Sequence, residues 1–270
     1  MIGLNRQLAP ISQAAWKHIE REAREALELH LAARRLVEFE GPLGWKHSAI
    51  DSGRLEPIAS PFRDVWARRR VVYPLVELRL HFQVERSELE RIDRGATSVE
   101  LDALREAARL FAAAEDTLLF EGSAEAGIPG LLRDSEHRPV GLSPDPVRLP
   151  EAITFAIEQL REAGVRGPYA AALGPAAHAA LSSAAGDGGY PVVRHVERLL
   201  DRPAIWAPTL QGGVVASLRG GDFKLVCGRD AAIGYERHDE KSVTLFLEES
   251  LGAELNGPEA VVPLLPAPPG

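Results

Sequence analysis

The sequence contains only one cysteine, Cys227, among its 270 residues. A single cysteine excludes a disulfide within the chain and fits a reducing compartment such as the cytoplasm. No run of about 18 apolar residues occurs, so we expect no membrane-spanning helix. The first ten residues, MIGLNRQLAP, lack the apolar core of a secretory signal. These absences predict a cytoplasmic protein.

An excess of positive charge is also missing. The chain has 31 Lys and Arg against 39 Asp and Glu, a net charge of −8. Because general nucleic-acid binders usually carry a basic excess, we expect no nucleic-acid partner. Hydrophobic residues make up 45% and charged residues 26% of the chain, which is typical of a globular protein.

Signatures of catalysis are absent too. The chain has no GxSxG, HExxH, Walker loop or paired-cysteine zinc motif. Its eight histidines are scattered, with no two at a one-turn spacing, and Cys227 lies in an apolar stretch where it would behave as a small hydrophobe. We therefore expect no catalytic residue, no metal and no cofactor. A chain of this length without such a site favours a function in assembly.

The longest helical pattern runs from Thr97 to Gly122. Thr97 and Glu100 have the spacing of a capping box, and Gly122 is a typical left-handed stop. The apolar stripe that predicts one buried face consists of Leu101, Leu104, Ala108, Phe111, Leu118 and Leu119. The adjacent Glu115 and Asp116 point about 100° apart on a helix, so they do not form an acid/base dyad by themselves. We expect this helix to be the central one.

The other patterns predict a mixed α+β protein with two lobes. Helices are expected at about 12–35, 85–95, 150–163, 175–181 and from Pro191 onward. The cleanest alternation of apolar and polar residues lies at 76–84, and further strands are expected at 36–40, 169–173, 204–207, 214–218, 223–227, 233–235 and 243–248. Residues 45–70 have no helical period and include Arg68, Arg69 and Arg70, which predicts an extended arm. Such a basic run is usually solvated; the alternative is contact with an acidic partner surface.

Several blocks of sequence resemble the family 1 encapsulins, in the same order along the chain. They include LNRQLAPISQAAWKHIEREA, GPLGW, YPLVELRLHF, LREAARLFAAAED, GIPGLL, GPYAAALGP, RGGDFKLVCGRDAAIGYE and LFLEESL, and they cover residues 4 to about 264. The resemblance implies an α+β fold like that of tailed-phage major capsid proteins. Its expected parts are a peripheral domain (1–45, 75–137 with the long helix, and 219–270 with C-terminal strands), an extended loop (46–74) and an axial domain (138–218).

The resemblance also implies a function. Identical copies, 60 in the smallest icosahedral form (T=1), would close into a nanocompartment shell around a cargo enzyme, either a ferritin-like iron oxidase or a dye-decolourising peroxidase. The cargo would be held by its C-terminal targeting peptide. The alternatives are a prophage major capsid protein that encloses DNA and, with less support, an enzyme in its own right.

The resemblance implies two sites. An apolar groove for the cargo peptide is expected to involve Leu31, Arg34, Glu38, Asp230, Ile233 and Tyr235. Arg34 and Glu38 lie four apart and could share one face at a helix end; the alternative is that they pair with each other and that Ile233 is core. A five-fold pore is expected at Asp187, Gly188, Gly189 and Tyr190, where a ring of Asp187 carboxylates would attract cations. The stretch ERSELERI lacks the aromatic residue that stacks a flavin in some relatives, so no flavin is expected.

Overall fold

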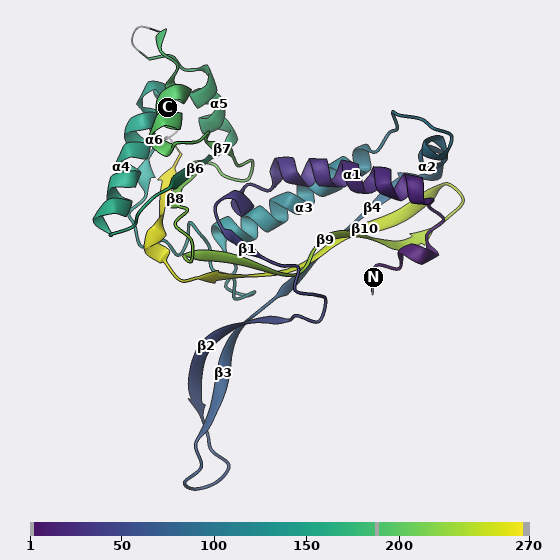
Figure 1. Ribbon diagram of the computed structural model, residues 1–270, viewed down its shortest axis with the longest axis horizontal. Helices are drawn as coiled ribbons and strands as arrows, with labels where there is room; N and C mark the ends of the chain where they lie inside the picture. Colours follow the sequence, from purple (N-terminus) through teal and green to yellow (C-terminus); the bar gives the residue numbers. More distant parts are fainter. Residues whose placement is uncertain (1–2, 187–188, 267–270) are drawn as a thin grey trace.

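The computed structural model describes residues 3–186 and 189–266. Two lobes lie side by side, and a slender hairpin projects from the body near their junction (Figure 1). The mixture of helices and sheets confirms the predicted α+β class. No helix within the described residues is both long enough and apolar enough to cross a membrane.

The first lobe is a four-stranded sheet with helices packed on one face. The strand order is β1-β9-β10-β4, in which β1 and β9 are parallel and the other pairs antiparallel. The strands are β1 (Glu38–Glu40), β4 (Val76–Glu85), β9 (Phe223–His238) and β10 (Ser242–Leu255). The helices are α1 (Gln13–His30), α2 (Arg86–Asp93) and α3 (Asp102–Glu121). In Figure 1, α1 and α3 run together above β9 and β10.

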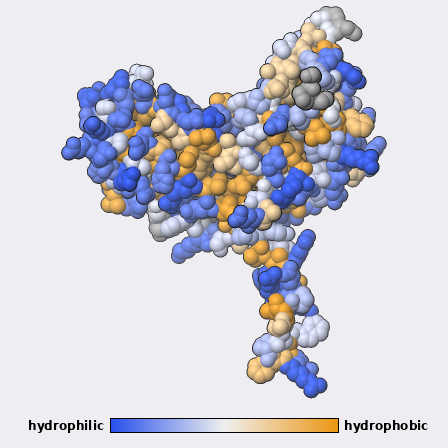
Figure 2. Space-filling view, turned by 180° about the vertical axis from the view of Figure 1, so that it is seen from behind, coloured by the Kyte–Doolittle hydropathy of each residue, from blue (hydrophilic) through white to orange (hydrophobic). Residues whose placement is uncertain are grey.

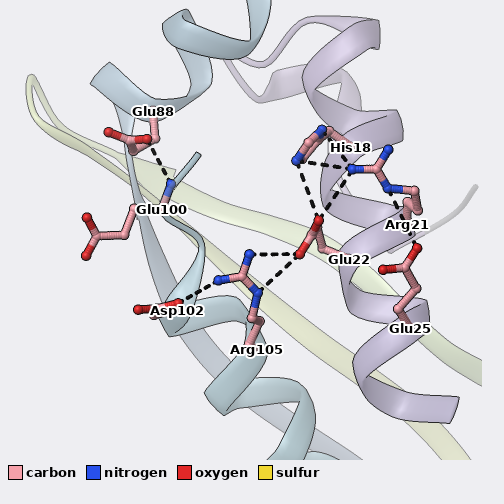
Figure 3. Close-up of polar contacts among 8 residues, drawn as sticks. All are labelled: His18, Arg21, Glu22, Glu25, Glu88, Glu100, Asp102 and Arg105. Carbon is pink, nitrogen blue, oxygen red and sulfur yellow. Dashed lines mark hydrogen bonds and ion pairs between the residues drawn. The ribbon is translucent and has the colours of Figure 1, made fainter. Parts of the chain in front are cut away.

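Helix α1 packs on α3 through an apolar stripe and an ionic seam. Ala15, Ile19, Ala23 and Leu27 recur every four residues and are buried, as a helical period requires. Beside them, both Nη2 and Nε of Arg105 on α3 donate to Glu22 Oε2, at 3.0 and 3.2 Å (Figure 3). The predicted helix at 12–35 was too long, because α1 ends at His30 and a separate 3₁₀ turn, η2 (Ala33–Arg35), follows.

Helix α3 begins later than predicted, and the capping box is wrong. The first helical residue is Asp102, and its N-cap, Leu101, makes no side-chain cap. In a capping box, the N–H of Glu100 would donate to the side chain of Thr97. Here it donates instead to Glu88 Oε2 of α2, at 2.9 Å (Figure 3). Val99 and Leu101 are buried although they precede the helix, so tertiary packing overrides the local signal.

The strands at the end of the chain are longer than predicted. Residues 223–227 and 233–235 belong to one strand, β9, which pairs with β10 along nearly its whole length. The sequence predicted two separate strands with residues 228–232 between them. In the structure, shifts of register between Glu248 and Leu251 absorb that irregular stretch without ending the ladder.

The second lobe has a five-stranded sheet, in the order β5-β11-β8-β6-β7, and its described residues form three α-helices. Its strands are β5 (Val140–Gly141), β6 (Tyr169–Leu173), β7 (Ile205–Trp206), β8 (Gly213–Ser217) and β11 (Val261–Leu265). Its helices are α4 (Leu149–Glu162), α5 (Pro175–Ser183) and α6 (Val192–Leu200). The expected grouping of 219–270 with the first lobe does not hold for β11, which pairs with β8 and β5 here.

The hairpin consists of β2 (Ala49–Ile58) and β3 (Ala67–Pro74), within the range expected for an extended loop. Apolar and charged side chains alternate along it in Figure 2, where it stands clear of the body. Its exposed large apolar residues are Leu55, Ile58, Phe62, Val65, Trp66 and Val72. An isolated two-stranded hairpin is marginally stable at best in water, so this surface is expected to be covered in an assembly.

Candidate peptide-binding groove

A groove of about 390 Å³ lies between the N-terminal segment, α1 and the middle of β9. Its apolar lining residues are Leu4, Ala23, Leu27, Leu31, Ala231, Ala232, Ile233 and Leu247. Its ionisable lining residues are Arg6, Glu20, Arg24, Glu28, Arg34 and Asp230. The groove therefore has an apolar floor and a rim with three cationic and three anionic side chains, a lining suited to a short apolar segment.

Four of the six residues expected to bind a peptide line this groove: Leu31, Arg34, Asp230 and Ile233. Leu31 is the C-cap of α1, and Arg34 lies in η2 immediately after it. Asp230 and Ile233 come from β9, almost 200 residues later in the chain. The fold thus brings the end of α1 and the irregular middle of β9 together.

The other two residues lie elsewhere. Glu38 is on β1, exposed, and lines a separate hollow with Arg35 and Gly220. The idea that Arg34 and Glu38 share a helix face is wrong because the helix has ended at His30. Tyr235 packs into the core beneath α1, and its hydroxyl lies 2.5 Å from Nδ1 of His238.

Arg34 does not pair with Glu38, the partner that the sequence left open, and its partners instead come from α3, β9 and β10. Its Nε and Nη2 donate to the two oxygens of Glu115, both at 2.7 Å, and Nη2 also donates to Glu249 Oε1 at 2.7 Å. Its Nη1 donates to Asp230 Oδ1 at 2.9 Å. Glu115 and Glu249 are completely buried. Arg34 therefore ties α3, β9 and β10 to the floor of the groove.

This buried cluster shifts the pKa values of its members. Burial alone lowers the pKa of Arg34, but hydrogen bonds and charges, first those of Glu115, raise it above its ordinary value. Burial, and then the negative charge of Glu115, raise the pKa of Glu249 well above its usual range. Burial likewise raises the pKa of the Cys227 thiol, which lies 3.1 Å from Glu249 Oε1. The Cys227 thiol is therefore protonated at pH 7.

Cys227, Asp230 and Glu249 are close enough to be considered as metal ligands, since their ligand atoms lie within 4.8 Å of one another. The chemistry of the cluster argues against a metal. Arg34 already donates to Asp230 and Glu249, and a metal needs the thiolate of Cys227, which its raised pKa disfavours. The cluster is better suited to hold the groove in shape.

Asp116 supports the same region from α3. Its two carboxylate oxygens accept the N–H groups of Ala32 and Ala33, at 3.1 and 2.9 Å, and so fix the start of η2. Burial raises the pKa of Asp116 to about 7, against the lowering effect of these two bonds. Glu115 and Asp116 were not predicted as site residues. The sequence did contain a signal for Glu115, because it continues the apolar stripe of Leu104, Ala108 and Phe111 on α3. A carboxylate on a buried stripe requires a cationic partner, so an ion pair at Glu115 was predictable.

The residues expected to line a pore are only partly described. Asp187 and Gly188 lie outside the described residues. Gly189 and Tyr190 follow α5, and the exposed Tyr190 accepts a hydrogen bond from Nη2 of Arg198 on α6, at 3.3 Å.

Comparison with known proteins places this geometry in a family. Residues 1–252 match the family model described as "Encapsulating protein for peroxidase". The chain is 46% identical to a type 1 encapsulin shell protein of Rhodospirillum rubrum, over 98% of this chain and 96% of the relative.

Solved structures show the same fold. A virus-like particle of Pyrococcus furiosus matches with a TM-score of 0.62 at 16% identity, covering 92% of this chain and 98% of that chain. The capsid of Myoviridae phage XM1 matches with a TM-score of 0.53 at 12% identity, covering 84% and 88%. The fold is that of tailed-phage major capsid proteins.

Proposed function

The chain belongs to the family 1 encapsulin shell proteins, and from this premise we propose that 60 copies close into a T=1 icosahedral nanocompartment around a cargo enzyme. The cargo is a dye-decolourising peroxidase or a ferritin-like iron oxidase. The description of the matching family, which names a peroxidase, favours the first. The chain itself is structural, as its Rhodospirillum relative is named a shell protein. The observation that carries the proposal is the groove between α1 and β9.

The hairpin supports assembly of many copies. Its large apolar residues stay exposed among the described residues of their own subunit, and a neighbouring copy would bury them. Charge favours the same contact. Residues 46–74 contain six basic and three acidic residues, whereas the rest of the chain has 25 basic and 36 acidic residues. A basic arm on an acidic body gives each copy two complementary surfaces, and such contacts produce a closed shell when the rotation between copies closes.

The groove supports capture of a cargo tail. Leu27, Leu31 and Ile233 provide an apolar floor, and Arg34 and Asp230 lie at its edge. The groove is open, so an extended C-terminal segment can enter from the side. Its apolar side chains would contact the floor, while main-chain groups would meet the polar rim. The inner face of the shell is the side on which α1 and this groove would lie.

Small solutes would reach the cargo through pores. We retain the loop at Asp187, Gly188, Gly189 and Tyr190 as the lining of the five-fold pore, mildly selective for cations through Asp187. Iron uptake by cargo-loaded shells should fall in Asp187→Lys; equal uptake would contradict this part of the proposal. The buried, protonated thiol of Cys227 is compatible with a shell that resides in the cytoplasm.

The test is purification of the protein from its native cells, followed by electron microscopy and mass spectrometry of the particles. We expect closed particles of one size that contain one enriched enzyme. Attaching the C-terminal tail of that enzyme to a fluorescent reporter should direct the reporter into the shell, and deleting the tail should abolish loading. Particles that contain DNA and no enzyme would instead support the prophage capsid, and a protein that forms no particles would overturn both.

A further inference from the structure

Two rows of side chains on α1 and its C-cap form one side of the groove. The inner row is buried and apolar and consists of Ala23, Leu27 and Leu31. The outer row is charged and exposed and consists of Glu20, Arg24 and Glu28. Because residues four apart on a helix lie one above the other, both rows run along α1, and so does the groove. The outer row is therefore a charged edge that a bound segment would follow.

The charges at the two ends of the groove are already paired within the chain. At one end, Nη2 of Arg6 lies 2.7 Å from Oε1 of Glu20. At the other end, Arg34 donates to Asp230 at 2.9 Å and to two buried carboxyl groups. A ligand would have to break these contacts before it could use either end for an ion pair of its own.

Arg24 and Glu28, which lie between the two ends, are not paired. Within residues 3–186 and 189–266, neither side chain has an ion-pair or hydrogen-bond partner, although the two are one turn apart. An arginine that precedes a glutamate by four residues is the less favourable order for such a pair. Arg21 and Glu25 have the same order but lie outside the groove lining, and they do pair, at 3.8 Å (Figure 3). The groove therefore presents one free cation and one free anion.

The spacing of these two charges defines the segment that fits them. Four residues of an α-helix advance about 6 Å, and two residues of an extended chain advance about 6.6 Å. Side chains two positions apart in an extended segment point to the same side, and the one between them points to the opposite side. An acidic side chain at Arg24 and a basic one at Glu28 would thus be two positions apart. The residue between them would face the opposite wall, where Ile233 and Leu247 are buried.

We propose that Arg24 and Glu28 are the residues that select the cargo tail by charge. Arg24 pairs with an acidic residue of the tail, and Glu28 pairs with a basic residue two positions away. The apolar residue between these two packs on Ile233. The two ion pairs thereby also fix the register of the tail in the groove. This inference rests on the proposed function, since it assumes that a cargo tail occupies the groove.

The first test is the sequence of the tail itself. The enzyme that co-purifies with wild-type shells is identified by mass spectrometry, and its C-terminal tail is read. We expect an acidic and a basic residue two positions apart, with an apolar residue between them. A tail that directs a reporter into the shell and contains no such triplet would overturn the inference.

The second test is a double-mutant cycle between the groove and the tail. The probe is a fluorescein-labelled peptide with the sequence of that tail, and its binding to purified, empty shells is followed by fluorescence anisotropy. Arg24→Gln and Glu28→Gln should each weaken binding about two- to fivefold, the range for a partly exposed ion pair. With a peptide whose acidic residue is replaced by its amide, Arg24→Gln should have no further effect, while Glu28→Gln keeps its full effect. With a peptide whose basic residue is replaced by glutamine, the pattern should be reversed.

Lys17→Gln is the matched control and should leave the affinity unchanged. Lys17 is exposed on α1, lies outside the groove lining and, like Arg24, has no ion-pair partner among the described residues. All three variants should unfold at the wild-type temperature, because none loses a contact within the subunit. Losses at Arg24 and Glu28 that are the same with every peptide, or no larger than that of Lys17→Gln, would overturn the inference. If wild-type shells form but bind no tail, the proposed cargo groove itself fails.

Discussion

Removing Arg34 should destabilise the protein more than any other exchange of a single arginine near the groove. In Arg34→Met the four hydrogen bonds to Glu115, Glu249 and Asp230 are lost, and two of these carboxyl groups are completely buried. Breaking a buried pair by removing one partner costs about 3–5 kcal/mol. For a chain of this size each kcal/mol lowers Tm by about 2–4 °C, so we expect a decrease of roughly 6–20 °C.

The assay is thermal unfolding of purified shells at a fixed subunit concentration, followed by tryptophan fluorescence at pH 8. Arg35→Met is the control, because Arg35 is exposed and, among residues 3–186 and 189–266, its side chain donates only to the main-chain oxygen of Glu28. We expect that control to change stability by no more than about 0.5 kcal/mol. The double variant Arg34→Met/Glu115→Gln should recover part of the loss, since one buried charge is then removed. Equal melting of Arg34→Met and Arg35→Met would refute the reasoning.

Three further predictions concern the pH response, the arm and the packing. The pKa of Asp116 is raised from 3.8 to about 7, so protonation of Asp116 favours the folded state. This contribution to the free energy of unfolding, on the order of 4 kcal/mol at most, is present below pH 4 and is lost as the pH rises through 7. Asp116→Asn should therefore show a flatter profile of denaturant midpoint against pH. On β3, Arg69 pairs with Glu56 at 2.7 Å, so its charge is already neutralised within the subunit. Arg69→Gln should therefore change the salt concentration at which shells dissociate, measured by light scattering, less than Arg68→Gln or Arg70→Gln does. Equal effects of the three exchanges would count against docking of the arm by charge. Gly130→Ala would drive a methyl group into the backbone at the end of α3 and should cost about 1–3 kcal/mol in chemical unfolding, whereas an unchanged midpoint would show that this contact is loose.

Regular elements were predictable wherever one period dominated the sequence. The alternation at 76–84 became β4, and residues 169–173 were predicted to the residue as β6. Prediction failed where a distant group decided the local structure. The capping box at Thr97 does not form, because the N–H of Glu100 donates to Glu88 of α2. Residues 228–232 continue the strand β9, because β10 pairs with β9 on both sides of them.

The groove was predicted in part, through the resemblance to the encapsulins. Four of the six residues that the resemblance implied, namely Leu31, Arg34, Asp230 and Ile233, line it. The polar contacts that organise the groove come from far along the chain. Arg34 meets Glu115 at a sequence separation of 81 and Glu249 at 215, and no pattern within one segment can indicate such a pairing. Arg6, which also lines the groove, was missed because its position depends on the pairing of the N-terminal segment with β9 through Leu4 and Tyr235.

The most direct test of the account is a cryo-electron microscopy map of shells purified with their native cargo. The account predicts a closed shell of 60 copies in which the arm of each copy lies on a neighbour. It also predicts a ribbon of additional density on the inner surface, running between α1 and β9 and past Arg6 and Arg34. A shell in which this groove opens to the exterior, or in which the cargo tail contacts another surface, would contradict the central claim.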